Sequence, residues 1–177
     1  LESNVSLGYE IDDIITTLKD SGKLVIYTVS DVLNFLYADR SFVVANMDAV
    51  NGRLAFTGYT IMRGSHYAGF IPVDEAGGVI WLLGRNIVHI RAVPTDSYIA
   101  TVEIKCKSRK ITPQYLNGQV TFNIDMDYTA QLMYMDNNIA VDKEQVEVIN
   151  SEMQALLLDE IVQAIQHSKA IGCAYLE

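Results

Sequence analysis

The stretch from Gly118 to Met135, GQVTFNIDMDYTAQLMYM, decides the fold that we expect. Apolar and aromatic residues occupy every second position, and polar residues occupy most of the positions between them. The apolar set is Val120, Phe122, Ile124, Met126, Tyr128, Ala130, Leu132 and Tyr134. A period of two places successive side chains on opposite faces of a strand. The pattern predicts a long strand of an antiparallel sheet, with one face covered and the other wet.

The segment from Tyr98 to Ile111 predicts the neighbouring strand, and Pro113 with Asn117-Gly118 predicts the turn between the two. Its alternation predicts an apolar face with Val102, Ile104, Cys106 and Ser108, and an opposite face with Glu103, Lys105, Lys107 and Arg109. We call Lys105, Lys107, Arg109 and Lys110 the basic strip. Two interpretations stay open for it: a solvated strand face, or a docking site for an acidic partner surface.

The last predicted element is a long amphipathic helix. Asp142 is its expected N-cap, with Gln145 at the reciprocal capping position, and the helix runs to about Ala170 and ends near Gly172. At 1.5 Å per residue it would span roughly 40 Å, enough to lie across the long strands and bury its apolar face. That face comprises Val146, Ile149, Met153, Leu156, Leu157, Ile161, Ala164 and Ile165.

Shorter elements are predicted ahead of the long strands. The first are a helix over Tyr9–Ser21, a strand over Lys23–Val29 and an extended Phe42–Val44. Between the last two, we expect a helix that is capped by Ser30 and has the apolar residues Val32, Leu33, Phe35, Leu36 and Tyr37. After a turn at Asn51-Gly52 come a hairpin over Leu54–Ile61 and Tyr67–Ile71, a helix over Val73–Leu83 entered near Asp74-Glu75, and a strand over Asn86–Val93. Gly77-Gly78 weakens the last helix by about 1 kcal/mol per glycine unless a close packing contact compensates.

These elements define an α+β fold class. We expect an antiparallel or mixed curved sheet with one long C-terminal helix packed across it, preceded by a smaller α/β segment. The likeliest boundary lies near residues 50–52. We therefore predict that residues 1–50 end a preceding region and that residues 51–177 form the C-terminal domain.

Composition limits the partners. Half of the 177 residues are hydrophobic and 20% are charged, which suits a packed core. The net charge of −9 repels polyphosphate, so nucleic acid is not an expected partner. It also repels an anionic lipid surface, and any membrane association should come from an anchor or a protein partner. No apolar stretch approaches the ~18–20 residues that span a bilayer.

Reactive constellations are not recognisable in the sequence. His66, His89 and His167 lie far apart, and Cys106 and Cys173 form no CxxC motif. There is no GxSxG nucleophile elbow and no phosphate-binding glycine loop. We predict no catalytic, cofactor-binding or metal-binding residue.

Three further features each have two interpretations. Asp125 and Asp127 are expected on the same strand face, about 7 Å apart. They are either part of a solvated strand face or a catalytic carboxylate pair. The segment starting at Asp136 resembles the start of an EF-hand loop but lacks its glycine, so a turn is expected. Trp81 is either a core residue or an interface anchor.

Three segments together resemble the Ger(x)C family of spore germination proteins. The first, Leu54–Leu82, has Thr57-Gly58, Gly69-Phe70, Asp74-Glu75, Gly78 and Trp81-Leu82 at the family's positions, although Tyr59–Met62 departs from the usual small-residue-then-Phe form. The second, Val102–Asn123, is similar to the family's strand pair. The third is the acidic final helix followed by Gly172-Cys173-Ala174. The start of the chain resembles the end of the family's preceding region.

The resemblance implies a lipoprotein, the C subunit of a germinant receptor, with its N-terminal lipid anchor outside this chain. It implies a place on the outer face of the spore inner membrane, beside membrane-spanning A and B subunits as partners. It implies no enzymatic activity and no cofactors. The alternative function is that of an extracytoplasmic sensor domain that itself binds a small-molecule germinant. An enzyme that uses Asp125 and Asp127 is the remaining hypothesis.

Overall fold

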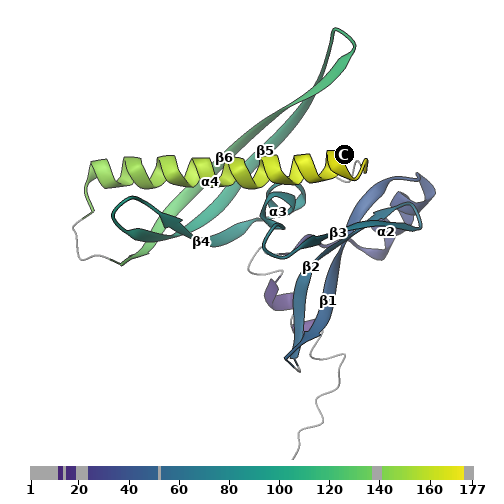
Figure 1. Ribbon diagram of the computed structural model, residues 1–177, viewed down its shortest axis with the longest axis horizontal. Coiled ribbons are helices and arrows are strands. Elements are labelled where there is room, and N and C mark those ends of the chain that lie inside the picture. Colours follow the sequence, from purple (N-terminus) through teal and green to yellow (C-terminus); the bar gives the residue numbers. More distant parts are fainter. Residues whose placement is uncertain (1–11, 14, 19–23, 52, 137–140, 174–177) are drawn as a thin grey trace, which may run out of the picture. The chain divides into compact units, whose positions relative to one another are not determined.

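The computed structural model describes residues 12–13, 15–18, 24–51, 53–136 and 141–173 (Figure 1). Contacts divide the chain into two compact units: residues 1–85 with 154–177, and residues 86–153. Two three-stranded antiparallel sheets and a long C-terminal helix confirm the predicted α+β class. The strands nevertheless form two sheets, where the sequence patterns had predicted one curved sheet.

The first unit contains the sheet β1-β2-β3. Its strands are β1 (Ser41–Val50), β2 (Arg53–Arg63) and β3 (His66–Pro72), all antiparallel to their neighbours. The predicted hairpin is therefore confirmed as β2 and β3. Buried residues on these strands are Phe42, Val43, Tyr59, Ile61 and Ile71. The predicted domain boundary falls in the turn between β1 and β2, and the division into residues 1–50 and 51–177 stays a prediction.

Helix α2 (Val29–Tyr37) precedes the sheet and begins earlier than predicted. Thr28, and not Ser30, is the N-cap, because the Thr28 hydroxyl accepts from the Asp31 amide at 3.1 Å while the Asp31 carboxylate accepts from the Thr28 amide at 2.8 Å. Residues 24–28 form no strand, so the predicted Lys23–Val29 strand is wrong for its described part. Leu24 and Val25 are buried all the same, and the Val25 amide donates to the Tyr59 hydroxyl at 2.9 Å.

Helix α3 (Gly77–Leu83) is shorter than predicted, because residues 73–75 form a turn ahead of it. Asp74 and Glu75 are therefore exposed turn residues and not the first turn of the helix. Every residue of α3 from Gly77 to Leu82 is buried. Of the predicted helix Tyr9–Ser21, residues 12–13 and 15–18 are helical, and the rest lies outside the described residues.

The second unit contains the sheet β4-β5-β6, with β4 (Val88–Pro94), β5 (Ile99–Leu116) and β6 (Gln119–Met135). Both long strands are confirmed, and β5 continues five residues past the predicted Ile111. Asn117 and Gly118 connect them with positive φ angles of 52° and 81°, which is the geometry of a type I′ hairpin turn. Buried residues of this sheet are His89, Val93, Ala100, Val102 and Ile104.

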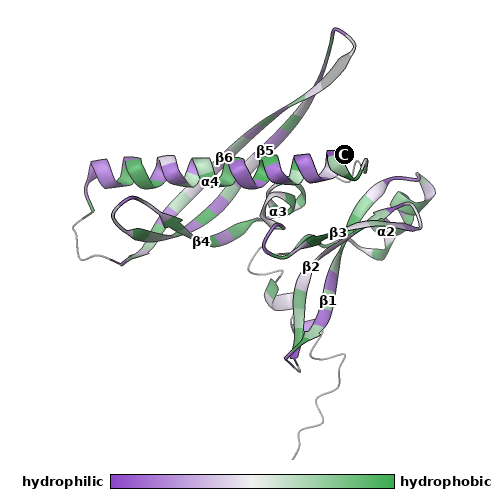
Figure 2. Cartoon of the chain, viewed as in Figure 1, coloured by the Kyte–Doolittle hydropathy of each residue, from purple (hydrophilic) through white to green (hydrophobic). Residues whose placement is uncertain are grey.

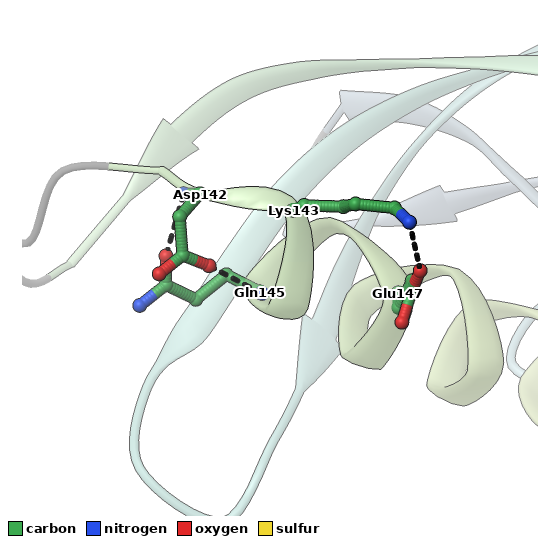
Figure 3. A network of polar contacts seen from close by, with 4 residues as sticks. All are labelled: Asp142, Lys143, Gln145 and Glu147. Atoms are coloured by element: carbon green, nitrogen blue, oxygen red, sulfur yellow. Dashed lines mark hydrogen bonds and ion pairs between the residues drawn. The ribbon is translucent and has the colours of Figure 1, made fainter.

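Helix α4 (Lys143–Ala170) begins and ends as predicted. The Gln145 amide donates to the Asp142 carboxylate at 3.0 Å, and the Asp142 amide donates to the Gln145 side chain at 2.7 Å (Figure 3). Lys143 and Glu147 form an exposed i,i+4 ion pair in the first turns. Hydrophilic and hydrophobic bands alternate along the helix (Figure 2), and its buried side chains are Ile149, Met153, Leu157 and Ala164.

Candidate interaction surface

Part of the family pattern, Gly78 and Trp81-Leu82, lies in the core of the first unit. Trp81 on α3 is 0% exposed, and its indole nitrogen donates to the Glu160 carboxylate on α4 at 2.7 Å. A buried indole N–H needs an acceptor, since an unsatisfied buried donor costs about 1–3 kcal/mol. Of the two interpretations of Trp81, the structure supports the core residue and excludes the exposed interface anchor.

Gly77 and Gly78 let α3 approach α4 closely. A Cβ atom on Gly78 would collide with the Glu160 carbonyl oxygen and lie 2.7 Å from the Ala164 Cβ. A Cβ on Gly77 would lie 2.6 Å from the Glu160 carboxylate carbon. The close packing contact that the glycine pair needs is therefore present, and we call it the α3–α4 contact.

Glu160 is a structural residue that the sequence analysis did not single out. It lies three residues after buried Leu157 and four before buried Ala164, so it shares their side of the helix. A carboxylate beside the apolar positions of the helix is the sequence feature that could have singled it out. Its role here is to accept the hydrogen bond from Trp81.

A β-bulge changes the predicted arrangement of the basic strip. Cys106 pairs with Tyr128 and Ser108 pairs with Asp127, so Lys107 is an extra residue with no partner position on β6. A bulge of one residue reverses which side chains face which way beyond it. Arg109 therefore lies on the Cys106 face, and the prediction that it shares a face with Glu103 and Lys105 is wrong.

Burial affects the two titratable groups beside the bulge. Desolvation raises the pKa of the Cys106 thiol, which disfavours the reactive thiolate. Desolvation also lowers the pKa of Arg109, although a guanidinium remains charged at neutral pH. Lys105, Lys107 and Lys110 are exposed. The docking of the basic strip to an acidic partner stays a prediction.

We call residues 107–127 the distal ribbon. It consists of the outer halves of β5 and β6 and their turn, beyond the last pairing of β4, which joins Val88 to Lys105. None of its described residues is buried. The predicted covering of one face of β6 is therefore wrong in this part of the strand, where Phe122 is 53% exposed.

The acidic residues on β6 and after it have local partners. Asp127 accepts from the Ser108 hydroxyl at 2.8 Å, and Asp125 accepts from the Asn123 side chain at 3.1 Å. Both carboxylates are exposed, which supports the wet strand face over a catalytic pair. Asp136 accepts from the Ile99 amide at 2.9 Å and so holds the start of β5, while residues 137–138 lie outside the described part.

A second exposed apolar surface lies on α2. Val29, Leu33, Leu36 and Tyr37 follow one another at helical spacing, and we call them the α2 stripe. All four are exposed, Val29 by 78% and Tyr37 by 88%. The opposite side of the helix carries Phe35, whose ring stacks on Phe42 at a centroid distance of 5.3 Å.

The remaining candidate residues are dispersed. His66 lies on β3, His89 is buried on β4 and His167 lies on α4. Neither Cys106 nor Cys173 forms a disulfide, and Cys173 is buried. Across the described ranges, no three His, Cys, Asp or Glu side chains gather in a way that could hold a metal ion. In the same ranges, no helix is both long and apolar enough to cross a membrane.

The comparisons with known proteins agree with the resemblance. Residues 57–176 match the family model described as spore germination B3/GerAC like, C-terminal. The match covers well over half of the chain, which therefore belongs to this family of spore germination proteins, as the Ger(x)C resemblance predicted.

A solved structure described as the crystal structure of the GerBC protein has the same fold. The TM-score is 0.69 at 21% sequence identity, and the match covers 79% of this chain. The chain corresponds to 45% of the length of that structure. No curated protein matches the sequence significantly.

Proposed function

We propose that this chain is the C-terminal region of the C subunit of a spore germinant receptor, and that it acts through protein contacts and not through catalysis. The observation that carries the proposal is the family match over residues 57–176. Within that match, Gly78 and Trp81 form the α3–α4 contact, so these family-pattern residues build a core. Among the described residues, the exposed surfaces that a partner could contact include the α2 stripe and the distal ribbon.

The partners that we propose are the membrane-spanning A and B subunits of the receptor. The subunit would be held at the outer face of the spore inner membrane by an N-terminal lipid anchor outside this chain. A net charge of −9 supports an anchor or protein partner over general attraction to anionic lipid.

The α2 stripe is the surface that we assign to a protein partner. Exposed apolar side chains at positions i, i+4 and i+7 of a helix are the pattern with which a helix fits an apolar groove. The stripe carries no charged residue, so burying it against a partner leaves no unpaired charge.

The test adds one negative charge to the stripe in one variant and the same charge outside the stripe in a control variant. Leu33→Glu places a carboxylate inside the stripe, and Asn34→Glu places one on the same helix outside it. Spores that carry Leu33→Glu should lose capture of the membrane-spanning subunits from inner-membrane extracts and should germinate slowly. Spores that carry Asn34→Glu should behave as wild type. Equal capture by both variants would reject the stripe as the contact.

The sensor hypothesis makes a separate prediction. A subunit that itself binds the germinant should show saturable heat of binding when the isolated chain is titrated with amino acids or sugars. A subunit that acts through protein contacts should show no saturable heat with these compounds and should still capture the other subunits. Saturable binding would replace the proposal with the sensor function.

A further inference from the structure

The distal ribbon has two faces of different chemistry. The pairs Arg109–Met126, Ile111–Ile124 and Pro113–Phe122 define the first, which Tyr115 continues along β5 and which we call the apolar face. The pairs Ser108–Asp127, Lys110–Asp125, Thr112–Asn123 and Gln114–Thr121 define the second, which we call the polar face. Cross-strand partners lie on the same side of a sheet, so the register alone makes this division.

The outer part of the apolar face is exposed to solvent, whereas Arg109, Ile124 and Met126 are half-buried. Ile111 is 38% exposed, Phe122 is 53% exposed and Tyr115 is 76% exposed. A two-stranded hairpin is at best marginally stable in water without a layer on its apolar side. The ribbon therefore presents a surface that gains from being covered.

The distribution of charge on the ribbon indicates what kind of surface covers its apolar face. Residues 111–124 contain no Asp, Glu, Lys or Arg. Both carboxylates of the ribbon, Asp125 and Asp127, belong to the polar face, while the only charged residue of the apolar face is Arg109. The bulge at Lys107 produces this arrangement, because without it Arg109 would lie on the other face. Lys107 itself is exposed at the same end.

We propose that the apolar face of the distal ribbon lies on an anionic lipid bilayer, with Tyr115 and Phe122 in the interfacial layer and Arg109 and Lys107 at the headgroup phosphates. Aromatic side chains favour the membrane–water interface, and a long cationic side chain reaches from it to the phosphates. Amphipathic elements of this kind are buried about 5–10 Å, at the boundary between headgroups and acyl chains.

Unpaired backbone groups at the edges of the ribbon limit how deeply it enters the bilayer. In the described part of the second unit, no strand pairs with the outer edge of β6, or with β5 beyond Lys105. Unpaired backbone groups at such edges are costly inside the hydrocarbon core, where water is absent. The ribbon therefore lies in the interface plane, where water still reaches its edges and its polar face.

The net charge of −9 opposes contact with anionic lipid but does not prevent it locally. The Debye length is about 8 Å at physiological ionic strength, whereas nine paired residues of a strand span about 30 Å. The segment 105–127 carries four cations against two carboxylates. The general repulsion expected from composition therefore does not hold at the ribbon.

The test uses the 177-residue chain and vesicles, with no other receptor subunit present, so its failure leaves the proposed function standing. Wild type should float with vesicles of phosphatidylglycerol and phosphatidylethanolamine. Phe122→Glu adds a negative charge on the apolar face, and Thr121→Glu adds the same charge at the neighbouring position on the polar face. Phe122→Glu should lower the partition coefficient about tenfold or more, because it removes an apolar anchor, and Thr121→Glu by less than about threefold.

Arg109→Gln separates the electrostatic contribution. A basic residue near an anionic surface contributes about 1 kcal/mol, so binding should fall about fivefold on these vesicles and stay unchanged on phosphatidylcholine. Circular dichroism should show all three variants folded as wild type.

Wild type that ignores both vesicle types would overturn the inference, and so would equal weakening by Phe122→Glu and Thr121→Glu. If wild type ignores lipid while Phe122→Glu loses capture of the membrane-spanning subunits, the apolar face belongs to a protein partner and the inference is wrong.

Discussion

The α3–α4 contact and the distal ribbon both contain residues of the matched family region, but they meet opposite environments. In the first, buried Gly78 and Trp81 meet Glu160: a Cβ on Gly78 has no room, and the Trp81 indole N–H donates to the Glu160 carboxylate. In the second, aromatic residues such as Tyr115 and Phe122 are largely exposed. The family pattern thus includes both a buried helix contact and a strand pair whose outer half is exposed.

The largest effect expected from this comparison is on stability. Trp81→Ala should lower the free energy of unfolding by about 3–5 kcal/mol, because it leaves a cavity in the core and removes the hydrogen bond to Glu160. Tyr115→Ala in the distal ribbon should change it by less than about 0.5 kcal/mol. Urea unfolding followed by circular dichroism measures both. Similar losses for the two variants would mean that the ribbon is as tightly packed as the core.

The glycines offer the next test. Gly78→Ala should destabilise the protein by about 1–3 kcal/mol, since the collision with the Glu160 backbone outweighs the gain of about 1 kcal/mol in helix propensity. Gly118→Ala meets no atom within 4 Å, but its φ of 81° should still cost about 1–2 kcal/mol. Thermal unfolding that shows Gly78→Ala to be stabilising would contradict the close approach of the two helices.

The hydrogen bond between Trp81 and Glu160 can be separated from packing. Glu160→Ala leaves the indole donor without this acceptor and should cost about 1–3 kcal/mol. Glu160→Gln keeps an oxygen acceptor of nearly the same shape and should cost less. Chemical denaturation of the two variants gives the order, and a greater loss for Glu160→Gln would show that charge, not hydrogen bonding, matters at this position.

The cap of α4 should matter less than the interior of the contact. Asp142→Ala removes the acceptor for the Gln145 amide and should lower stability by about 1 kcal/mol. If the two side chains act as a reciprocal pair, Gln145→Ala added to Asp142→Ala should cost less than the sum of the single changes. Additive losses would show that the two hydrogen bonds act independently.

The smallest effect concerns pH and α2. Hydrogen bonds from Thr28 hold the pKa of Asp31 below its usual 3.8, so the folded state binds fewer protons there than the unfolded state. The contribution of Asp31 is then complete above pH 3.8 and is lost as the pH falls through the lowered value. Amide exchange of α2 should quicken over that range in wild type but not in Asp31→Asn. Equal pH dependence would reject the capping role.

Several predictions from the sequence were correct because their signals are local. The cap of α4 by Asp142 and Gln145 involves residues three apart, and the alternation along β6 follows from the pleat of one strand as far as Leu132. The prediction that Tyr134 shares the face of Leu132 is wrong, because a register shift at Met133 moves Tyr134 to the other face. Local signals also failed where two were in competition. Thr28 and Ser30 are both good N-caps, and Asp31 lies at the reciprocal position of Thr28, which decides between them.

The sequence by itself determined the α+β class and the ends of the long helix, because these follow from residues close together in the chain, and it determined the family through the order of three segments along the chain. Tertiary structure alone decided that the strands form two sheets, that Gly78 meets Glu160 and that Lys107 is a bulge. The reason is that register and close packing are relations between distant segments. A single extra residue in β5 changes the face of Arg109 without changing the alternation that the sequence displays.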